Sequence, residues 1–209
     1  MTFDEYRINY WRMFLLLEKE FVKALDYVEL NTNNYTTTSI VFSKLLLSIG
    51  TEIDNVFREC SQLSGRTNIE QYYKFIINKY PQIIKQQVKV KDTTIILIPY
   101  SEWNGNQPSK SLLFWQKYNE LKHDRILTAQ NASLENVLNA LAGLFILEMY
   151  RFDEIYKIQE STFTNTPDGE LQSKLFVLSS WEEKIRISKI KLEYSLYDEE
   201  NEKYDFKIK

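Results

Sequence analysis

Hydrophobic side chains recur at spacings of three and four over residues 3–28, which is the pattern of a helix with one apolar face. The positions on this face are Phe3, Tyr6, Tyr10, Phe14, Leu17, Phe21, Leu25 and Val28. A polar run at residues 31–35 ends the pattern. We therefore predict a long amphipathic helix at the start of the chain.

Three further helices follow from the same spacing. Threonines at 36–38 can cap a second long helix that runs to about Leu63. Its predicted core side comprises Ile40, Leu47, Ile49, Ile53, Val56 and Phe57. A shorter helix begins near Ile69 and ends before Pro81, and a last long helix spans about 132–157. Together these helices predict a bundle.

The period of the pattern changes to two near residue 86. Val88 and Val90 alternate with polar residues, a turn follows at 91–93, and an apolar run at 95–98 precedes Pro99. Alternation returns after a boundary at 165–169, first in Leu175 and Val177 and then over 190–208. The predicted fold is a mainly α-helical bundle over 1–160 with a β-hairpin near 86–98, followed by a small β-rich C-terminal extension over 170–209.

Composition and charge restrict the class of protein. With 209 residues, 44% of them hydrophobic, the chain is long enough for one substantial core. A net charge of -3 argues against a broad binding surface for duplex DNA. No apolar run approaches the length of a membrane span, and the N-terminus lacks the features of a signal peptide. Cys60 has no partner for an internal disulfide, so we predict a cytoplasmic protein that does not contact a membrane.

The single histidine of the chain, His123, is the obvious candidate for acid/base chemistry near neutral pH. It lies at the end of a helix whose predicted N-cap is Ser109 or Ser111. Trp115, Asn119 and His123 are spaced by four, so they form a row along the edge of that helix. Such a helix end could serve phosphodiester chemistry. Alternatively, His123 is structural and bonds a backbone carbonyl.

Two cations accompany this histidine, and aromatic residues lie nearby. Lys122 or Arg125 could stabilise charge on phosphate oxygens while the imidazole moves a proton. Trp103 and Trp115 could stack on bases, although aromatic residues at such positions also form cores. With one histidine and one cysteine, the familiar zinc sites lack ligands, and the five glycines form no phosphate loop. We expect no metal and no cofactor.

The stretch from Tyr118 to His123, YNELKH, resembles the motif of the HEPN superfamily (higher eukaryotes and prokaryotes nucleotide-binding). Its ribonuclease members carry an arginine, often followed by asparagine, and a histidine four to six residues later. Asn119 and His123 match this motif, whereas Tyr118 stands at the place of the arginine. A closer resemblance is to the W…YN..KH.R pattern of uncharacterised bacterial helical proteins related to that superfamily. The residues of this pattern are Trp115, Tyr118, Asn119, Lys122, His123 and Arg125.

The resemblance covers residues 37–157 and implies a function. It implies a homodimer that joins two motifs in one cleft and a metal-independent endoribonuclease of bacterial defence or toxin type, with an antitoxin as partner. His123 would be the acid/base, Asn119 would orient it, and Lys122 or Arg125 would stabilise the phosphorane. The contacts to RNA or a nucleotide would come from Trp115, Tyr118 and Trp103. Because the motif arginine is missing, a non-catalytic binding or protein-interaction module remains the alternative.

Overall fold

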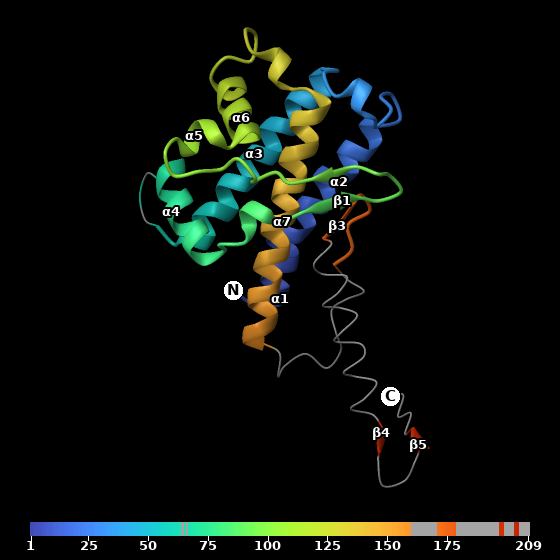
Figure 1. The fold of residues 1–209 in the computed structure, drawn as a ribbon, viewed down its shortest axis with the longest axis vertical. Helices are drawn as coiled ribbons and strands as arrows, with labels where there is room; N and C mark the ends of the chain where they lie inside the picture. Colours follow the sequence, from blue (N-terminus) through green and yellow to red (C-terminus); the bar gives the residue numbers. More distant parts are fainter. Residues whose placement is uncertain (64, 66, 160–170, 179–196, 199–202, 205–209) are drawn as a thin grey trace.

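Helices make up most of the computed structural model, which describes residues 1–63, 65, 67–159, 171–178, 197, 198, 203 and 204 (Figure 1). The helices are α1 (Phe3–Tyr6), α2 (Arg12–Ala24), α3 (Ile40–Ser61), α4 (Ile69–Lys79), α5 (Pro108–Ser111), α6 (Leu113–His123) and α7 (Leu134–Gln159). The strands are β1 (Val88–Val90), β2 (Ile96–Leu97), β3 (Phe176–Leu178), β4 (Tyr197–Asp198) and β5 (Lys203–Tyr204). The predicted fold class is confirmed.

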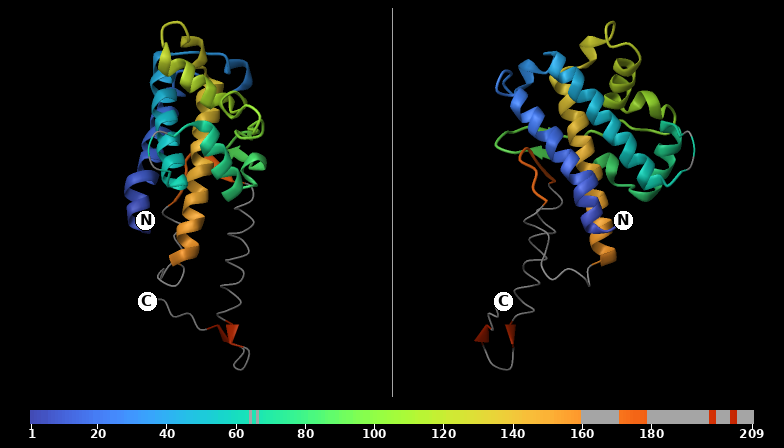
Figure 2. Two further views of the ribbon diagram at one scale, coloured as in Figure 1. Left: turned by 90° about the vertical axis from the view of Figure 1, so that its left-hand side faces the viewer. Right: turned by 180° about the vertical axis from the view of Figure 1, so that it is seen from behind.

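Helix α7 is the centre of the bundle. It runs alongside α3 and the α1–α2 helix, and it also contacts α6 and β3 (Figures 1 and 2). Residues 140–149 are all buried, because neighbours cover every side of this part of the helix. Such all-round burial explains why its sequence, ALAGLFILEM, has almost no polar face. Among the described residues, no helix is long and apolar enough to cross a membrane.

The first predicted helix is present, but its register changes in the middle. Between α1 and α2 lies a π-helical segment, Arg7–Trp11, in which the N–H of Arg12 bonds the carbonyl of Arg7 five residues back. The extra residue turns Trp11 into the core, where it is 1% exposed, and leaves Tyr10 only partly buried. Tyr10 still packs against the edge of the core, whereas Trp11, which an uninterrupted α-helical period did not select, is the residue that is fully buried.

Helix α3 begins later than the sequence suggested. Its N-cap is Ser39, whose hydroxyl accepts a hydrogen bond from the N–H of Phe42 at 3.0 Å, so the threonines at 36–38 lie outside the helix. The predicted core residue Ile40 is 81% exposed. It precedes the buried Phe42 by two positions, which places it roughly 200° around the helix, on the opposite face.

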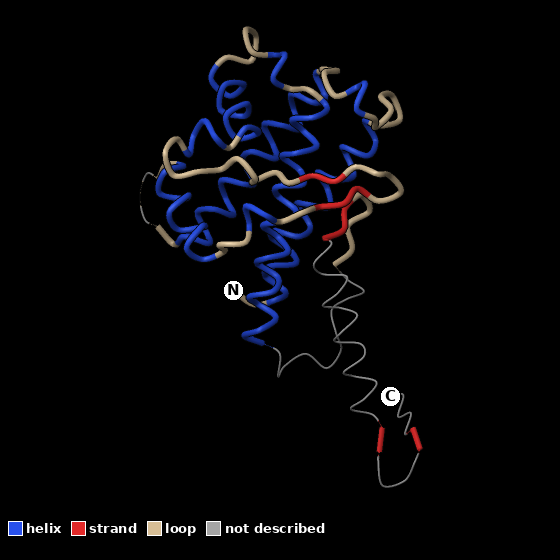
Figure 3. The backbone as a smooth tube through the Cα atoms, in the orientation of Figure 1, coloured by secondary structure: helices blue, strands red, loops and turns tan. Residues whose placement is uncertain are grey.

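A three-stranded antiparallel sheet lies across the helices (Figure 3). The predicted hairpin forms from β1 and β2, with Val88 opposite Leu97, and β3 pairs with the other edge of β1, with Val88 opposite Leu178. Residues 176–178, which lie inside the predicted β-rich extension over 170–209, thus complete the sheet of the helical part. Strands β4 and β5 pair with each other, and the rest of the predicted alternation over 190–208 lies outside the described residues.

Glu18 of α2 fixes the approach to β3. Its carboxylate is 2% exposed and accepts hydrogen bonds from the hydroxyl of Ser173 and from the N–H groups of Lys174 and Leu175, both at 3.0 Å. Three donors satisfy an acid that would otherwise be costly to bury. The contact joins the first helix to the last strand of the sheet.

Candidate functional site

Helix α6 carries the predicted site, and its start differs from the prediction. A short helix, α5, precedes it with Pro108 at the first position, and the N-cap of α6 is Leu112, which makes no side-chain cap. The predicted cap Ser111 instead accepts a hydrogen bond from the N–H of Asn104 at 3.0 Å, within the preceding loop. The helix is therefore held by burial of its apolar face rather than by a cap.

Tyr118 forms the centre of that apolar face and is 3% exposed. Its ring lies directly against Gly50 of α3: a Cβ at this glycine would be 2.3 Å from two ring carbons. Only a residue without a side chain allows the two helices to approach so closely here. Tyr118, which stands at the place of the motif arginine, is thus a packing residue in the α3–α6 contact.

The two tryptophans predicted to contact RNA also belong to the core. Trp115 is 6% exposed and packs on Phe57 and Tyr118, with ring centroids 5.8 and 5.3 Å apart. Trp103 is 3% exposed, stacks on Phe57 at 5.6 Å, and donates its indole N–H to the carbonyl of Pro108 at 3.2 Å. Protein rings cover these faces, so the burial of both residues and of Tyr118 does not fit a role in stacking on bases.

Three polar residues of the pattern lie at the exposed end of α6. His123 is its last residue, and within the described part of the chain its imidazole makes no hydrogen bond or ion pair. Lys122 places its ammonium 5.4 Å from the ring centroid of Tyr118, a cation–π contact. Arg125 is exposed in the turn that follows. Cations are favourable at this end of a helix because its carbonyl dipoles point toward them.

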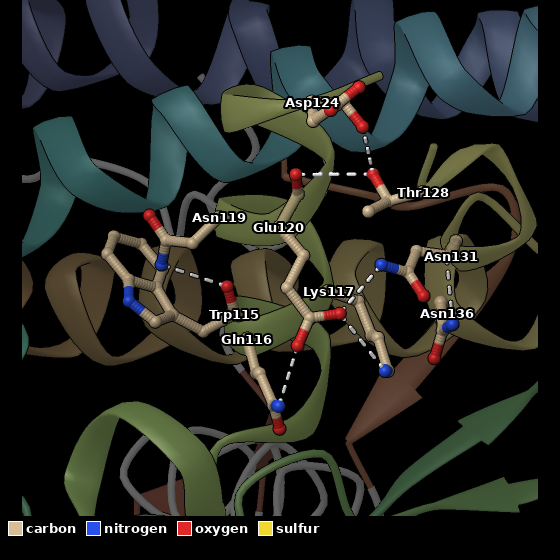
Figure 4. Close-up of polar contacts among 9 residues, drawn as sticks. All are labelled: Trp115, Gln116, Lys117, Asn119, Glu120, Asp124, Thr128, Asn131 and Asn136. Atoms are coloured by element: carbon tan, nitrogen blue, oxygen red, sulfur yellow. Dashed lines mark hydrogen bonds and ion pairs between the residues drawn. The ribbon is translucent and has the colours of Figure 1, made fainter. Parts of the chain in front are cut away.

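Asn119 does not contact the imidazole. Its amide nitrogen donates to the carbonyl of Trp115 at 3.0 Å, one turn back in the same helix (Figure 4). The predicted orientation of His123 by Asn119 is therefore absent from this conformation, although the amide oxygen of Asn119 remains on the partly exposed edge of the helix.

Glu120, which sequence reasoning did not select, organises the polar side of α6 (Figure 4). Its carboxylate accepts hydrogen bonds from Gln116 at 2.7 Å, Lys117 at 3.2 Å and Asn131 at 2.7 Å. Partial burial acts to raise the pKa of Glu120, but these donors outweigh it and hold the pKa below its ordinary value. Asn131 precedes α7, so Glu120 links α6 to the start of the central helix.

The turn that carries Arg125 is fixed by side chains on both sides (Figure 4). The hydroxyl of Thr128 donates to the carbonyls of Glu120 at 3.2 Å and Asp124 at 2.5 Å. The carboxylate of Asp124 accepts from the N–H of Leu127 at 3.0 Å. These bonds hold Arg125 close to the helix end that presents Lys122 and His123. These hydrogen bonds could not be predicted from the sequence, in which only the position of Glu120 inside the motif drew attention to this region.

Fold and site together define a helical protein whose one imidazole lies beside two cations on an exposed helix end. Among the described residues, no group of histidine, cysteine, aspartate and glutamate is arranged to hold a metal ion. A scan against protein-family models, a search of curated proteins and a search of solved structures each found no match to this chain.

Proposed function

We propose that this chain is a HEPN-like cytoplasmic endoribonuclease that works as a homodimer and needs no metal ion, in a defence or toxin role with an antitoxin as partner. One observation carries the proposal: Lys122 holds a cation 5.4 Å above Tyr118, the residue at the place of the motif arginine, and the exposed His123 follows it directly. A cation and an imidazole thus share one helix end.

The chemistry is a transesterification within RNA. The 2′-oxygen attacks phosphorus while a base removes its proton, and an acid protonates the leaving 5′-oxygen as the P–O bond breaks. Lys122 and Arg125 stabilise the negative charge that develops on the phosphoryl oxygens. Since each chain has one histidine, an imidazole pair that acts as base and acid requires two copies. The exposed Ile126 and Leu127, 83% and 75% exposed beside this site, support a contact between copies here.

Cleavage of RNA by purified protein tests this proposal. Changing His123 to alanine should lower the rate by about 10²–10⁴-fold, the usual contribution of an acid/base residue. Because His123 is exposed, the variant should unfold at the same urea concentration as the wild type. Gln130→Ala, an exposed change in the following loop, serves as the matched control. Cleavage that persists in folded His123→Ala would exclude His123 as the catalytic residue, and loss of cleavage in EDTA would exclude a metal-independent reaction.

Burial of Tyr118 favours the second candidate, a non-catalytic module that binds RNA or a protein partner through the same helix end. An arginine at this position would have to bury its guanidinium against Gly50, so this helix packing is built for an uncharged ring. Such a module would bind single-stranded RNA without cleaving it. Its affinity would fall with salt, and neutralising Lys122 and Arg125 together would reduce the slope of that dependence.

A further inference from the structure

The outer surface of α2 carries a second row of residues at helical spacing, on the side away from the core. The members of this row are spaced by three and four: Met13, Leu16, Glu20, Lys23 and, in the turn after the helix, Tyr27. Between Met13 and Ala24 this surface is about 16 Å long, which is three turns. Leu16 is 50% exposed and Tyr27 is 85% exposed. Apolar residues at such a spacing usually pack on another element, and here they lack one among the described residues.

A groove of about 420 Å³ lies between this row and α3. Its apolar lining comes from both helices and from the turn after α2: Ala24, Tyr27, Val28, Val41 and Phe42. On the α3 side the exposed apolar surface continues through Val41 to the neighbouring Ile40. The two helices lie side by side and turn this surface toward the viewer in the right-hand view of Figure 2. A concave apolar site that is bordered by exposed apolar side chains is typical of an interaction surface.

The charged residues that line the groove leave an excess of positive charge. Glu20 of α2 and Lys44 of α3 form an ion pair at 3.0 Å, so their charges compensate each other. Lys23 also lines the groove, and it makes no hydrogen bond or ion pair within the described part of the chain. The groove therefore has one uncompensated cation beside its apolar lining.

Two more cations on α2 add to this charge. Arg12, Lys19 and Lys23 lie within about 40° of one another around the helix. Arg12 and Lys19 are exposed, and they too have no hydrogen bond or ion pair among the residues that the structure describes. Two acids, Asp26 and Glu29, follow in the turn after α2, but neither of them lines the groove. This side of α2 is thus cationic in a chain whose net charge is -3.

We propose that this groove docks an acidic amphipathic helix of a partner protein. The apolar residues of that helix enter the groove and cover Leu16, and its carboxylates pair with Lys23 and Lys19. The exposed row extends along α2 beyond the groove, and a helix covers this length whereas a small molecule does not. A lipid surface does not fill a concave site. A second copy of the chain in a symmetric contact would bring like charges together, because each copy presents the same cations.

An NMR titration of the full chain with two synthetic helical peptides of about five turns tests the proposal. One peptide has leucines at spacings of three and four with glutamates beside them, and the other has lysines in place of the glutamates. We expect the acidic peptide to bind saturably, to shift the amide signals of residues 13–28 and 39–44, and to bind more weakly as salt is raised. The basic peptide should not bind.

Two variants test the charge and the apolar lining separately. Lys23→Glu should weaken binding of the acidic peptide about tenfold, because it turns an attraction into a repulsion. Lys74→Glu, at an exposed lysine of α4, changes the net charge equally and should leave the dissociation constant unchanged. Val41→Asn should weaken binding about fivefold or more by removing an apolar contact. Because Lys23 and Val41 are exposed, both variants should unfold at the same urea concentration as the wild type.

The proposal has several ways to fail. A lack of saturable binding of the acidic peptide, equal binding of the basic peptide, or an unchanged affinity in Lys23→Glu would each overturn it. Binding to phosphatidylglycerol vesicles that is lost in Val41→Asn would assign the surface to a membrane instead. A dimer in sedimentation that is lost in this variant would assign the surface to a second copy. None of these measurements depends on cleavage of RNA.

Discussion

Replacing Gly50 with alanine tests the closest helix contact of the structure. The added Cβ would lie 2.3 Å from two carbons of the Tyr118 ring and 2.7 Å from a third. Carbon atoms prefer a separation of about 3.5 Å or more, so the ring and α6 must move by roughly 1.2 Å. Overpacking of a buried site costs about 1–3 kcal/mol, and the burial of the ring puts this change near the upper end.

The intrinsic helix propensity of alanine opposes this cost. Within a helix, alanine is more stable than glycine by about 1 kcal/mol, so Gly50→Ala should destabilise the protein by roughly 2 kcal/mol. Gly143→Ala in α7 is the control, because the same gain applies while its Cβ would lie 3.0 Å from the nearest atom, in the ring of Phe114. The control should change stability by less than about 1 kcal/mol.

Urea unfolding followed by circular dichroism measures both free energies. In a Tyr118→Ala background the clash is absent, so Gly50→Ala should change sign and stabilise by about 1 kcal/mol. If Gly50→Ala were as stable as the wild type, or were equally destabilising with and without the ring of Tyr118, the close approach of α3 and α6 would be refuted.

Three further predictions concern buried polar groups. Glu18→Ala should cost about 2–4 kcal/mol, because the N–H of Lys174 and the hydroxyl of Ser173 lose their acceptor and the N–H of Leu175 keeps only the Ser173 oxygen at 3.2 Å. Faster hydrogen exchange in residues 173–178 should accompany the loss, whereas Glu20→Ala, at an exposed ion pair, should change stability by under about 0.5 kcal/mol. Burial raises the pKa of Cys60 to about 11, so iodoacetamide at pH 8 should label the native thiol far more slowly than the urea-unfolded thiol, and equal rates would contradict its burial. Burial raises the pKa of Glu148 to about 8 in the folded protein, so this group contributes stability below about pH 4 that is lost as pH rises toward 8. The free energy of unfolding of Glu148→Gln should therefore rise relative to that of the wild type as pH increases, on the order of 3 kcal/mol by pH 7. A difference between the two proteins that stays constant with pH would contradict this.

The helices could be predicted because their apolar faces are long, and the deviations have local causes. Ile40 is apolar and close to a helix start, yet its face meets no other element, which periodicity alone does not reveal. The π segment brings Trp11 fully into the core beside the partly buried Tyr10, because one extra residue enters the turn. The pairing of β3 with β1 joins residues more than eighty positions apart, and a local pattern contains no information on such a pairing.

The site was only partly predictable, for a related reason. The row of Trp115, Asn119 and His123 at spacing four is consistent with the exposed position of His123, but it did not show that Trp115 points into the core. How deeply a side chain of α6 is buried depends on the neighbouring helix, and here on the absence of a side chain at Gly50. Glu148 had a visible signal, since it is a lone acid in the apolar run ALAGLFILEM, which is typical of a buried ionisable group.

The sheet has a consequence for the order in which the protein is made. Strand β1 is the middle strand, and among the residues that the structure describes its second edge pairs with residues 176–178. Every helix that the structure describes, from α1 to α7, precedes β3 in the sequence, so a ribosome synthesises the residues of these helices first. Until β3 is made, the edge of β1 opposite β2 lacks the strand that pairs with it in the described fold, and the groups that donate to the carboxylate of Glu18 have not been synthesised. Any chaperone that protects the nascent chain would therefore be needed longest at this edge.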